Sequence, residues 1–134
     1  MKENKFRIWE HTKKKLSYVG KLDYLPDVGG YNFHTIGCEI IPSMSNVIVI
    51  QQFIGKLDVN ECEIYEGDIV EYIEKMYEHR DATKAKGIIK YCSELCAYGA
   101  ADTLDGYVTA YFFEGVYNHW KVIGNIYENK DLIK

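Results

Sequence analysis

The sequence lacks the features that define several large classes of proteins. No apolar run approaches the roughly 18 residues of a membrane span, and the first ten residues contain no apolar core of a secretory signal. The glycine-rich dinucleotide fingerprint, the Walker phosphate loop and the Gly-x-Ser-x-Gly nucleophile motif are all missing. These absences predict a cytoplasmic protein without membrane contact, and they disfavour nucleotide-dependent chemistry.

Excess positive charge is also missing, because the formal net charge is −4. The chain as a whole therefore does not attract nucleic acid or an anionic membrane, and any such binding depends on a local patch. The 134 residues suffice for one domain with a real core, and 47% of them are hydrophobic. Aromatic residues, 12 of them tyrosines, make up 14% and favour strands over helices.

Alternating apolar and polar residues predict a β-rich chain. Residues 6–9 and 16–19 predict a hairpin around the polar turn at 11–15. Further strands are expected at residues 31–36, 46–54, 69–73, 86–91, 107–113 and 120–127, and short helical turns at 74–84, 93–101 and 131–134.

We therefore expect a mainly β (β-rich α+β) fold. An N-terminal β lobe, residues 1–57, would pack on a small C-terminal β-barrel, residues 58–134, with the polar turn at 55–60 between them. Both lobes would belong to a single domain covering residues 5–130.

Four cysteines raise the question of a metal site. Cys92 and Cys96 are the one close pair, and Cys62 or His79 would have to complete the set. Structural zinc sites usually show two close pairs, so this spacing predicts ordinary reduced thiols and no metal.

Catalytic groups occur without a catalytic pattern. Histidines are present, but none follows a recognisable nucleophile, and the carboxylate pairs Asp102 with Asp105 and Glu71 with Glu74 are typical of solvated loops and strand faces. We expect no catalytic residues, no cofactor and no enzymatic activity.

Five lysines offer an alternative function. Lys13, Lys14 and Lys15 lie in the first predicted turn, and Lys84 and Lys86 precede a strand. On a small barrel with exposed tyrosines, such lysines can bind nucleic acid. Lysines at turns and strand edges also keep proteins soluble and block edge pairing, and this second interpretation is favoured.

Three segments resemble the YopX family of phage and prophage proteins. They are KFRIW at residues 5–9, the pair QFIGKLD at 52–58 and EIYEGDIV at 63–70, and VIGNIYEN at 122–129, whereas residues 74–106 show no resemblance. The resemblance implies a phage-encoded or prophage-encoded cytoplasmic protein with a mostly β fold that includes a small C-terminal barrel. It assigns no catalytic residues to this chain, because the family is uncharacterised and has none to carry over.

The leading hypothesis is a non-enzymatic accessory protein that associates with itself through exposed strand edges or aromatic surface and binds an unknown host or phage protein. The nucleic-acid-binding barrel is the alternative. Within the central segment, Gly67 is expected to adopt a positive φ in a tight turn that the Asp68 carboxylate fixes. The segment is thus interpreted as architecture.

Overall fold

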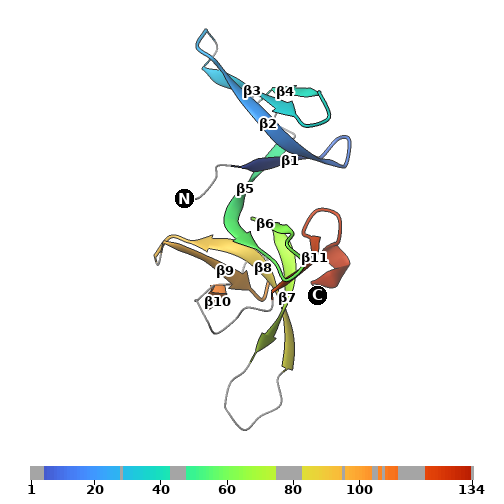
Figure 1. Ribbon diagram of the computed structural model, residues 1–134, viewed down its shortest axis with the longest axis vertical. Helices are drawn as coiled ribbons and strands as arrows, with labels where there is room; N and C mark the ends of the chain where they lie inside the picture. The colour runs from blue at the N-terminus through green and yellow to red at the C-terminus, as the bar shows by residue number, and fades with distance from the viewer. Residues whose placement is uncertain are drawn as a thin grey trace. The chain divides into compact units, whose positions relative to one another are not determined.

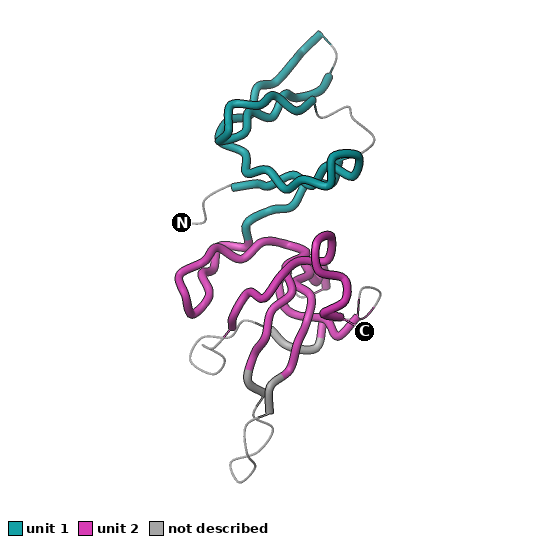
Figure 2. The backbone as a smooth tube through the Cα atoms, turned by 90° about the vertical axis from the view of Figure 1, so that its right-hand side faces the viewer, with its two compact units in different colours: residues 1–53 teal, residues 54–134 magenta. Residues whose placement is uncertain are grey.

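The computed structural model contains two β-sheets, and each strand pairing described is antiparallel (Figure 1). It describes residues 5–27, 29–42, 48–74, 83–94, 96–103, 106, 108–111 and 120–133. The chain divides into two units, residues 1–53 and residues 54–134, which are coloured separately in Figure 2. The predicted mainly β class is confirmed.

The strands follow one another with short connections. They are β1 (Phe6–Glu10), β2 (Lys15–Leu25), β3 (Gly30–Thr35), β4 (Ile40–Pro42), β5 (Ile48–Leu57), β6 (Glu63–Tyr65), β7 (Asp68–Glu74), β8 (Thr83–Cys92), β9 (Ala97–Ala101), β10 (Val108–Tyr111) and β11 (Lys121–Asn125), followed by the 3-10 helix η1 (Lys130–Leu132). The first sheet has the order β4-β3-β2-β1-β5-β6, and the second has the order β10-β9-β8-β7-β11.

In the first unit, one face of the sheet forms a small apolar core. Ile8 pairs with Ser17 of β2, and Phe33 pairs with Ile41 of β4. Ile8, Phe33 and Ile41 are buried together, with Val19 packed against them. The predicted hairpin of residues 6–9 and 16–19 is confirmed, because β1 and β2 pair in antiparallel orientation. Cross-strand pairs on one face of such a hairpin can be buried together.

β5 does not end where the sequence predicted. The polar residues 55–60 indicated a turn, but β5 continues through Leu57 and is hydrogen-bonded to β6. The strand therefore contains residues of both units, since the division falls between Phe53 and Ile54. Gly55 takes φ +88 within this strand, a conformation that glycine adopts without steric cost.

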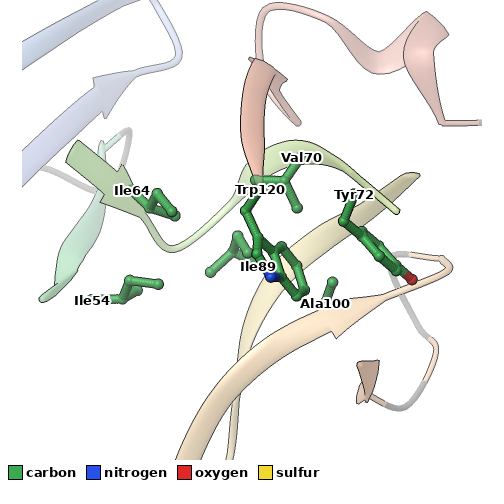
Figure 3. Close-up of a cluster of buried hydrophobic side chains, with 7 residues drawn as sticks. All are labelled: Ile54, Ile64, Val70, Tyr72, Ile89, Ala100 and Trp120. Atoms are coloured by element: carbon green, nitrogen blue, oxygen red, sulfur yellow. The ribbon is translucent and has the colours of Figure 1, made fainter. Parts of the chain in front are cut away.

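The second unit has a larger core, formed by residues of β5 to β9 together with Trp120 (Figure 3). Tyr72 of β7 stacks on Trp120, with ring centroids 4.6 Å apart and an interplanar angle of 21°. The buried members are Ile54, Ile64, Val70, Tyr72, Ile89, Ala100 and Trp120. Burying each large side chain contributes about 1.5 to 3 kcal/mol, so this cluster is a main source of stability for the unit.

The expected closed barrel is not found among the described residues. The second sheet ends at β10 on one side and at β11 on the other, and no pairing joins these two strands in the part of the chain that the structure describes. Evenly spaced short strands suit either a barrel or an open sheet, so the sequence pattern alone did not separate the two.

The expected helical turns are partly wrong. Residues 97–101 form β9 and pair with β8, although their alanines favour a helix. β7 reaches Glu74 and β8 begins at Thr83, while the rest of the predicted turn at 74–84 lies outside the described residues. The turn expected at 131–134 corresponds to η1, Lys130–Leu132.

The central segment has the predicted turn. Gly67 adopts φ +84, and the buried Asp68 carboxylate accepts a hydrogen bond of 2.8 Å from the backbone N–H of Tyr65. The N–H of Gly67 donates to the carbonyl oxygen of Ile89 at 3.0 Å, and its carbonyl oxygen accepts from the N–H of Ile126, also at 3.0 Å. This turn therefore connects β6, β8 and the segment after β11.

Asp58 organises the turn between β5 and β6. Its Oδ1 accepts hydrogen bonds from the backbone N–H groups of Asn60 and Cys62, at 2.8 and 2.9 Å, and its Oδ2 accepts one from Val122 at 3.0 Å. Burial opposes the charged form, but these backbone hydrogen bonds outweigh it and hold the pKa of Asp58 below its usual value. One carboxylate thus joins this turn to β11.

Gly87 of β8 lies where two strands approach closely. A Cβ atom at this position would lie 2.6 Å from the Cβ of Ala100. We expect Gly87→Ala to lower the free energy of unfolding by about 1 to 3 kcal/mol through overpacking, as measured by chemical denaturation. Ala100→Gly should restore part of that loss in the double variant. Equal destabilisation of the single and double variants would contradict this account of the contact.

Candidate functional site

The most distinctive surface of the first unit lies on the hairpin formed by β2 and β3. Leu22 pairs with Phe33, and Tyr24 pairs with Tyr31, so these side chains share the face that carries the small core. Phe33 is buried, whereas Leu22, Tyr24 and Tyr31 are 46%, 60% and 41% exposed. We call these three exposed residues the hairpin surface.

The two tyrosines of the hairpin surface form an aromatic pair. Their ring centroids are 5.3 Å apart and the ring planes are tilted by 49°. Such pairs favour each other by about 0.5 to 1.5 kcal/mol beyond the area they bury, so the rings hold one another in place. The pair is therefore an ordered apolar surface open to solvent.

An open depression of about 390 Å³ adjoins the hairpin surface. It lies at a β-bulge where the register between β2 and β3 shifts between Val19 and Lys21. Its lining residues are Phe6, Val19, Gly20, Lys21 and Leu22. This volume lies in the lower part of the range of ligand pockets, roughly 300 to 1,000 Å³, and it is large enough for an apolar side chain.

The opposite face of the same hairpin is charged. The Asp23 Oδ2 lies 2.6 Å from the Nε2 of His34, and its Oδ1 lies 3.3 Å from the Nζ of Lys21. The hydrogen bond with His34, aided by Lys21, lowers the pKa of Asp23. The carboxylate is therefore ionised at neutral pH. The hairpin thus has an apolar face and a charged face.

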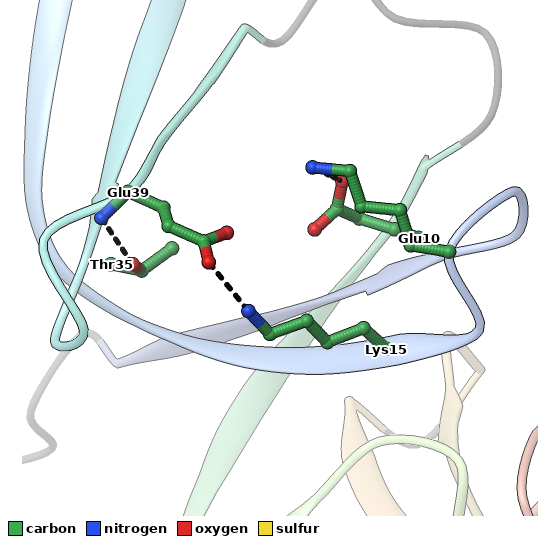
Figure 4. Close-up of polar contacts among 5 residues, drawn as sticks. Glu10, Lys15, Thr35 and Glu39 are labelled. Atoms are coloured by element: carbon green, nitrogen blue, oxygen red, sulfur yellow. Dashed lines mark hydrogen bonds and ion pairs between the residues drawn. The ribbon is translucent and has the colours of Figure 1, made fainter.

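Two of the three lysines expected at the first turn are engaged with carboxylates (Figure 4). The Nζ of Lys15 donates to Oε1 of Glu39 at 2.6 Å, and Glu39 is positioned by a 3.0 Å hydrogen bond from its own N–H to the Oγ1 of Thr35. The Nζ of Lys13 lies 3.6 Å from Oε2 of Glu10. Pairing with Glu39 raises the pKa of Lys15. Two of the three charges are thus balanced by local acids.

The five lysines of the alternative hypothesis fall in different units. Lys14 is exposed at the first turn with φ +50, in the same unit as Lys13 and Lys15. Lys86 is exposed on β8 in the second unit, opposite Glu71 of β7. Lys84 belongs to β8 as well, but its side chain is outside those described.

The residues weighed for metal binding do not form a metal site in the described part of the chain. The four cysteines form no disulfide bonds, and no group of three or more metal-ligating side chains occurs among the described residues. His79, Asp105 and the side chain of Glu74 lie outside the described part.

Sequence reasoning missed the hairpin surface. Leu22 and Tyr24 alternate with charged residues, and this alternation was a usable signal. It indicates two different faces without telling which apolar face stays exposed. Which apolar residues stay exposed depends on how far the small core extends along the hairpin, and this extent is a property of the fold.

These features define an antiparallel β protein of two sheets with an exposed aromatic hairpin. The model of one protein family, described as YopX protein, matches residues 5–134, and the chain belongs to this YopX family. The matched range includes residues 74–106, where the sequence itself showed no resemblance. Membership suggests a phage-associated protein of uncharacterised role.

A solved structure supports the fold. Protein EF1440 from Enterococcus faecalis is similar over 100% of both chains, with 23% sequence identity and a TM-score of 0.56. At this identity the likeness shows the fold alone. No curated protein matches the chain in sequence. Among the described residues, no helix has the length and apolar character needed to cross a membrane.

Proposed function

We propose that the chain is a non-enzymatic accessory protein of a phage or prophage that acts in the host cytoplasm by binding a protein partner. The observation that carries the proposal is the hairpin surface, where Leu22, Tyr24 and Tyr31 are 41% to 60% exposed on a face that is buried further along. Aromatic residues are enriched at protein interfaces, and they often supply most of the binding energy.

The chemistry of this surface favours a protein over a nucleic acid as partner. Its exposed side chains are a leucine and two tyrosines, and the nearby Asp23 is ionised. Phosphate groups are attracted by clustered positive charge, whereas here Lys21 is already paired with Asp23. Apolar side chains of a partner protein can instead exclude water from the tyrosine rings and gain from their burial.

Comparative capture from host cells tests this proposal. The tagged wild-type chain and the Leu22→Ser/Tyr24→Ser variant are expressed in lysogenic host cells during prophage induction, and recovered proteins are quantified by mass spectrometry. A partner that uses the hairpin surface should be recovered at least about tenfold less with the variant, because each lost anchor commonly costs more than 1 kcal/mol.

Tyr91→Ser is the matched control. Tyr91 is 49% exposed and pairs with Tyr98 across a hairpin of the second unit, with ring centroids 5.1 Å apart. This control removes an exposed tyrosine from a comparable aromatic pair and should leave recovery unchanged. Equal loss of the recovered proteins with both variants would count against the proposal, and so would unchanged recovery with both. Specific turnover of a substrate by the purified chain would contradict its non-enzymatic part.

A further inference from the structure

Part of one edge of β2 has no neighbouring strand among the residues that the structure describes. β1 pairs with β2 up to Arg7 and Tyr18, whereas β2 runs on to Leu25 and pairs there with β3 on its other side. β1 and β3 are its neighbours in the sheet order, so within the described part of the chain nothing pairs with residues 21–25 on the side of β1. Figure 1 shows β2 and β3 continuing beyond β1. We call residues 21–25 on this side the open edge.

The backbone groups that point toward the open edge can be identified. The carbonyl oxygen of Leu25 accepts a hydrogen bond of 2.9 Å from the N–H of Gly29, so the backbone groups of Leu25 face β3. Successive residues of a strand direct their N–H and C=O groups to opposite edges. Tyr24 therefore faces the open edge, Asp23 faces β3 and Leu22 again faces the open edge. The edge offers two donors and two acceptors to an incoming strand.

Side chains on both faces restrict what such a strand can carry. Leu22 and Tyr24 are exposed on one face, so apolar side chains of the incoming strand would be buried against them there. On the other face, a residue opposite Asp23 meets an ionised carboxylate, and a residue opposite Lys21 meets an ammonium group. The open depression beside Phe6, Val19 and Leu22 lies where the open edge begins and can hold a large apolar side chain.

We propose that the partner protein adds an extended segment to the open edge as an antiparallel strand, with a lysine or arginine opposite Asp23 between two apolar residues and an acidic residue opposite Lys21. The inference rests on the proposed function and specifies the chemistry of its partner. Main-chain hydrogen bonds supply the affinity of strand addition, and alternate side chains supply the specificity.

A second copy of the chain fits this edge less well. Two open edges that pair through Leu22 and Tyr24 would place Leu22 of each copy opposite Tyr24 of the other. The two Asp23 carboxylates would then lie directly opposite each other, and like charges in that position are destabilising. A basic residue of a different protein removes this conflict, which is why the proposal commits to a separate partner.

Two synthetic peptides test the proposal with the full-length chain. The matching peptide is Thr-Val-Lys-Val-Glu-Thr, and the charge-swapped peptide is Thr-Val-Glu-Val-Lys-Thr, both with blocked ends. We expect saturable changes of the amide chemical shifts of Leu22 and Tyr24 in ¹⁵N-labelled protein, with the swapped peptide binding about tenfold more weakly because two charge pairs turn from attractive to repulsive.

Three variants separate the edge from the hairpin surface. Tyr24→Ser keeps the N–H group at the edge and should weaken binding, whereas Tyr24→Pro removes that donor and should abolish it. The charge-exchanged variant Lys21→Glu/Asp23→Lys should invert the preference, so that the swapped peptide binds better, because both charge pairs then become attractive with that peptide. This gain of binding cannot result from misfolding, and circular dichroism checks the fold of all three variants.

Several outcomes would overturn the proposal. They are no saturable shift at Leu22 or Tyr24 with the matching peptide up to several millimolar, unchanged preference in Lys21→Glu/Asp23→Lys, and equal binding by Tyr24→Ser and Tyr24→Pro. Sedimentation that shows a dimer lost in Tyr24→Pro would assign the edge to a second copy instead. If the captured partner depends on Leu22 and Tyr24 but the peptide does not bind, the proposed function stands and the strand addition fails. If the peptide binds but no captured partner depends on Leu22 and Tyr24, the strand addition stands and the proposed function fails.

Discussion

Replacing Gly67 by valine is expected to lower the free energy of unfolding by about 3 kcal/mol or more, a large part of the stability of a domain of this size. Gly67 is buried and has φ +84, a region in which a β-branched residue is a genuine outlier. The strain alone costs about 1 to 3 kcal/mol. Any rotation that relieves it would disturb the hydrogen bonds of Gly67 to Ile89 and Ile126.

Thermal and chemical denaturation of the purified variant measure this effect. Gly37→Val is the matched control, because Gly37 is exposed and an added Cβ would meet its nearest atom, Thr35 Oγ1, at 3.9 Å. The control should stay within about 0.5 kcal/mol of the wild type. A Gly67→Val protein with wild-type thermal stability would show that the turn before β7 does not require the left-handed conformation.

Asp58→Ala should destabilise the second unit by about 3 to 5 kcal/mol at pH 7. The substitution removes a carboxylate that accepts three backbone hydrogen bonds, from Asn60, Cys62 and Val122. Hydrogen bonds to a charged group contribute about 1.5 to 3 kcal/mol each, and the amides left behind lose a partner in a half-buried place. Asp102→Ala, which removes an exposed carboxylate in the same unit, should change the stability by less than about 0.5 kcal/mol.

The effect of Asp58 should depend on pH in one direction. Its pKa is lower in the folded protein than in the unfolded chain, so its stabilisation is fully present above the unfolded-state pKa of about 3.9 and is lost as the pH falls through the folded-state pKa. The difference in unfolding free energy between wild type and Asp58→Asn should therefore be constant above about pH 5 and shrink below about pH 4. A difference that grows in acid would contradict the assignment.

Much of the fold could be predicted because apolar alternation and burial agree in it. Ile8 and Trp9 were expected in a hairpin and are buried there, and Gly67 and Asp68 form the turn that their chemistry indicated. In each case the local sequence preference and the tertiary environment favour the same structure. The strongest predictions are therefore those in which a residue type has few alternatives, such as a glycine at positive φ.

The errors arose where partners distant in sequence decide the structure. Residues 97–101 are rich in alanine and prefer a helix in isolation, but pairing with β8 on one side and β10 on the other makes them a strand. The segment around Gly55 looks like a turn, yet β6 extends the strand through Leu57. Tertiary pairing outweighed local preference at both places.

The candidate site was less predictable than the fold. Lys13 and Lys15 were visible in the sequence as positive charges. The partner of Lys13, Glu10, directly precedes the turn, but Glu39, the partner of Lys15, comes from the loop before β4 and could not be read from the turn itself. The exposure of Tyr24 and Tyr31 follows from where the core ends relative to the hairpin. This exposure depends on how far β2 and β3 extend beyond β1.

The position of β11 in its sheet has a consequence for synthesis on the ribosome. β11 pairs with β7, and Val122 contacts Asp58, a residue 64 positions earlier in the chain. Translation delivers residues 121–125 after residues 68–74, so β7 lacks its neighbour β11 until residues 121–125 have emerged. The hairpin of β1 and β2, by contrast, has both its strands as soon as Leu25 has emerged. The nascent chain therefore passes through a stage in which its first hairpin can be formed while the edge of β7 needs protection from other chains.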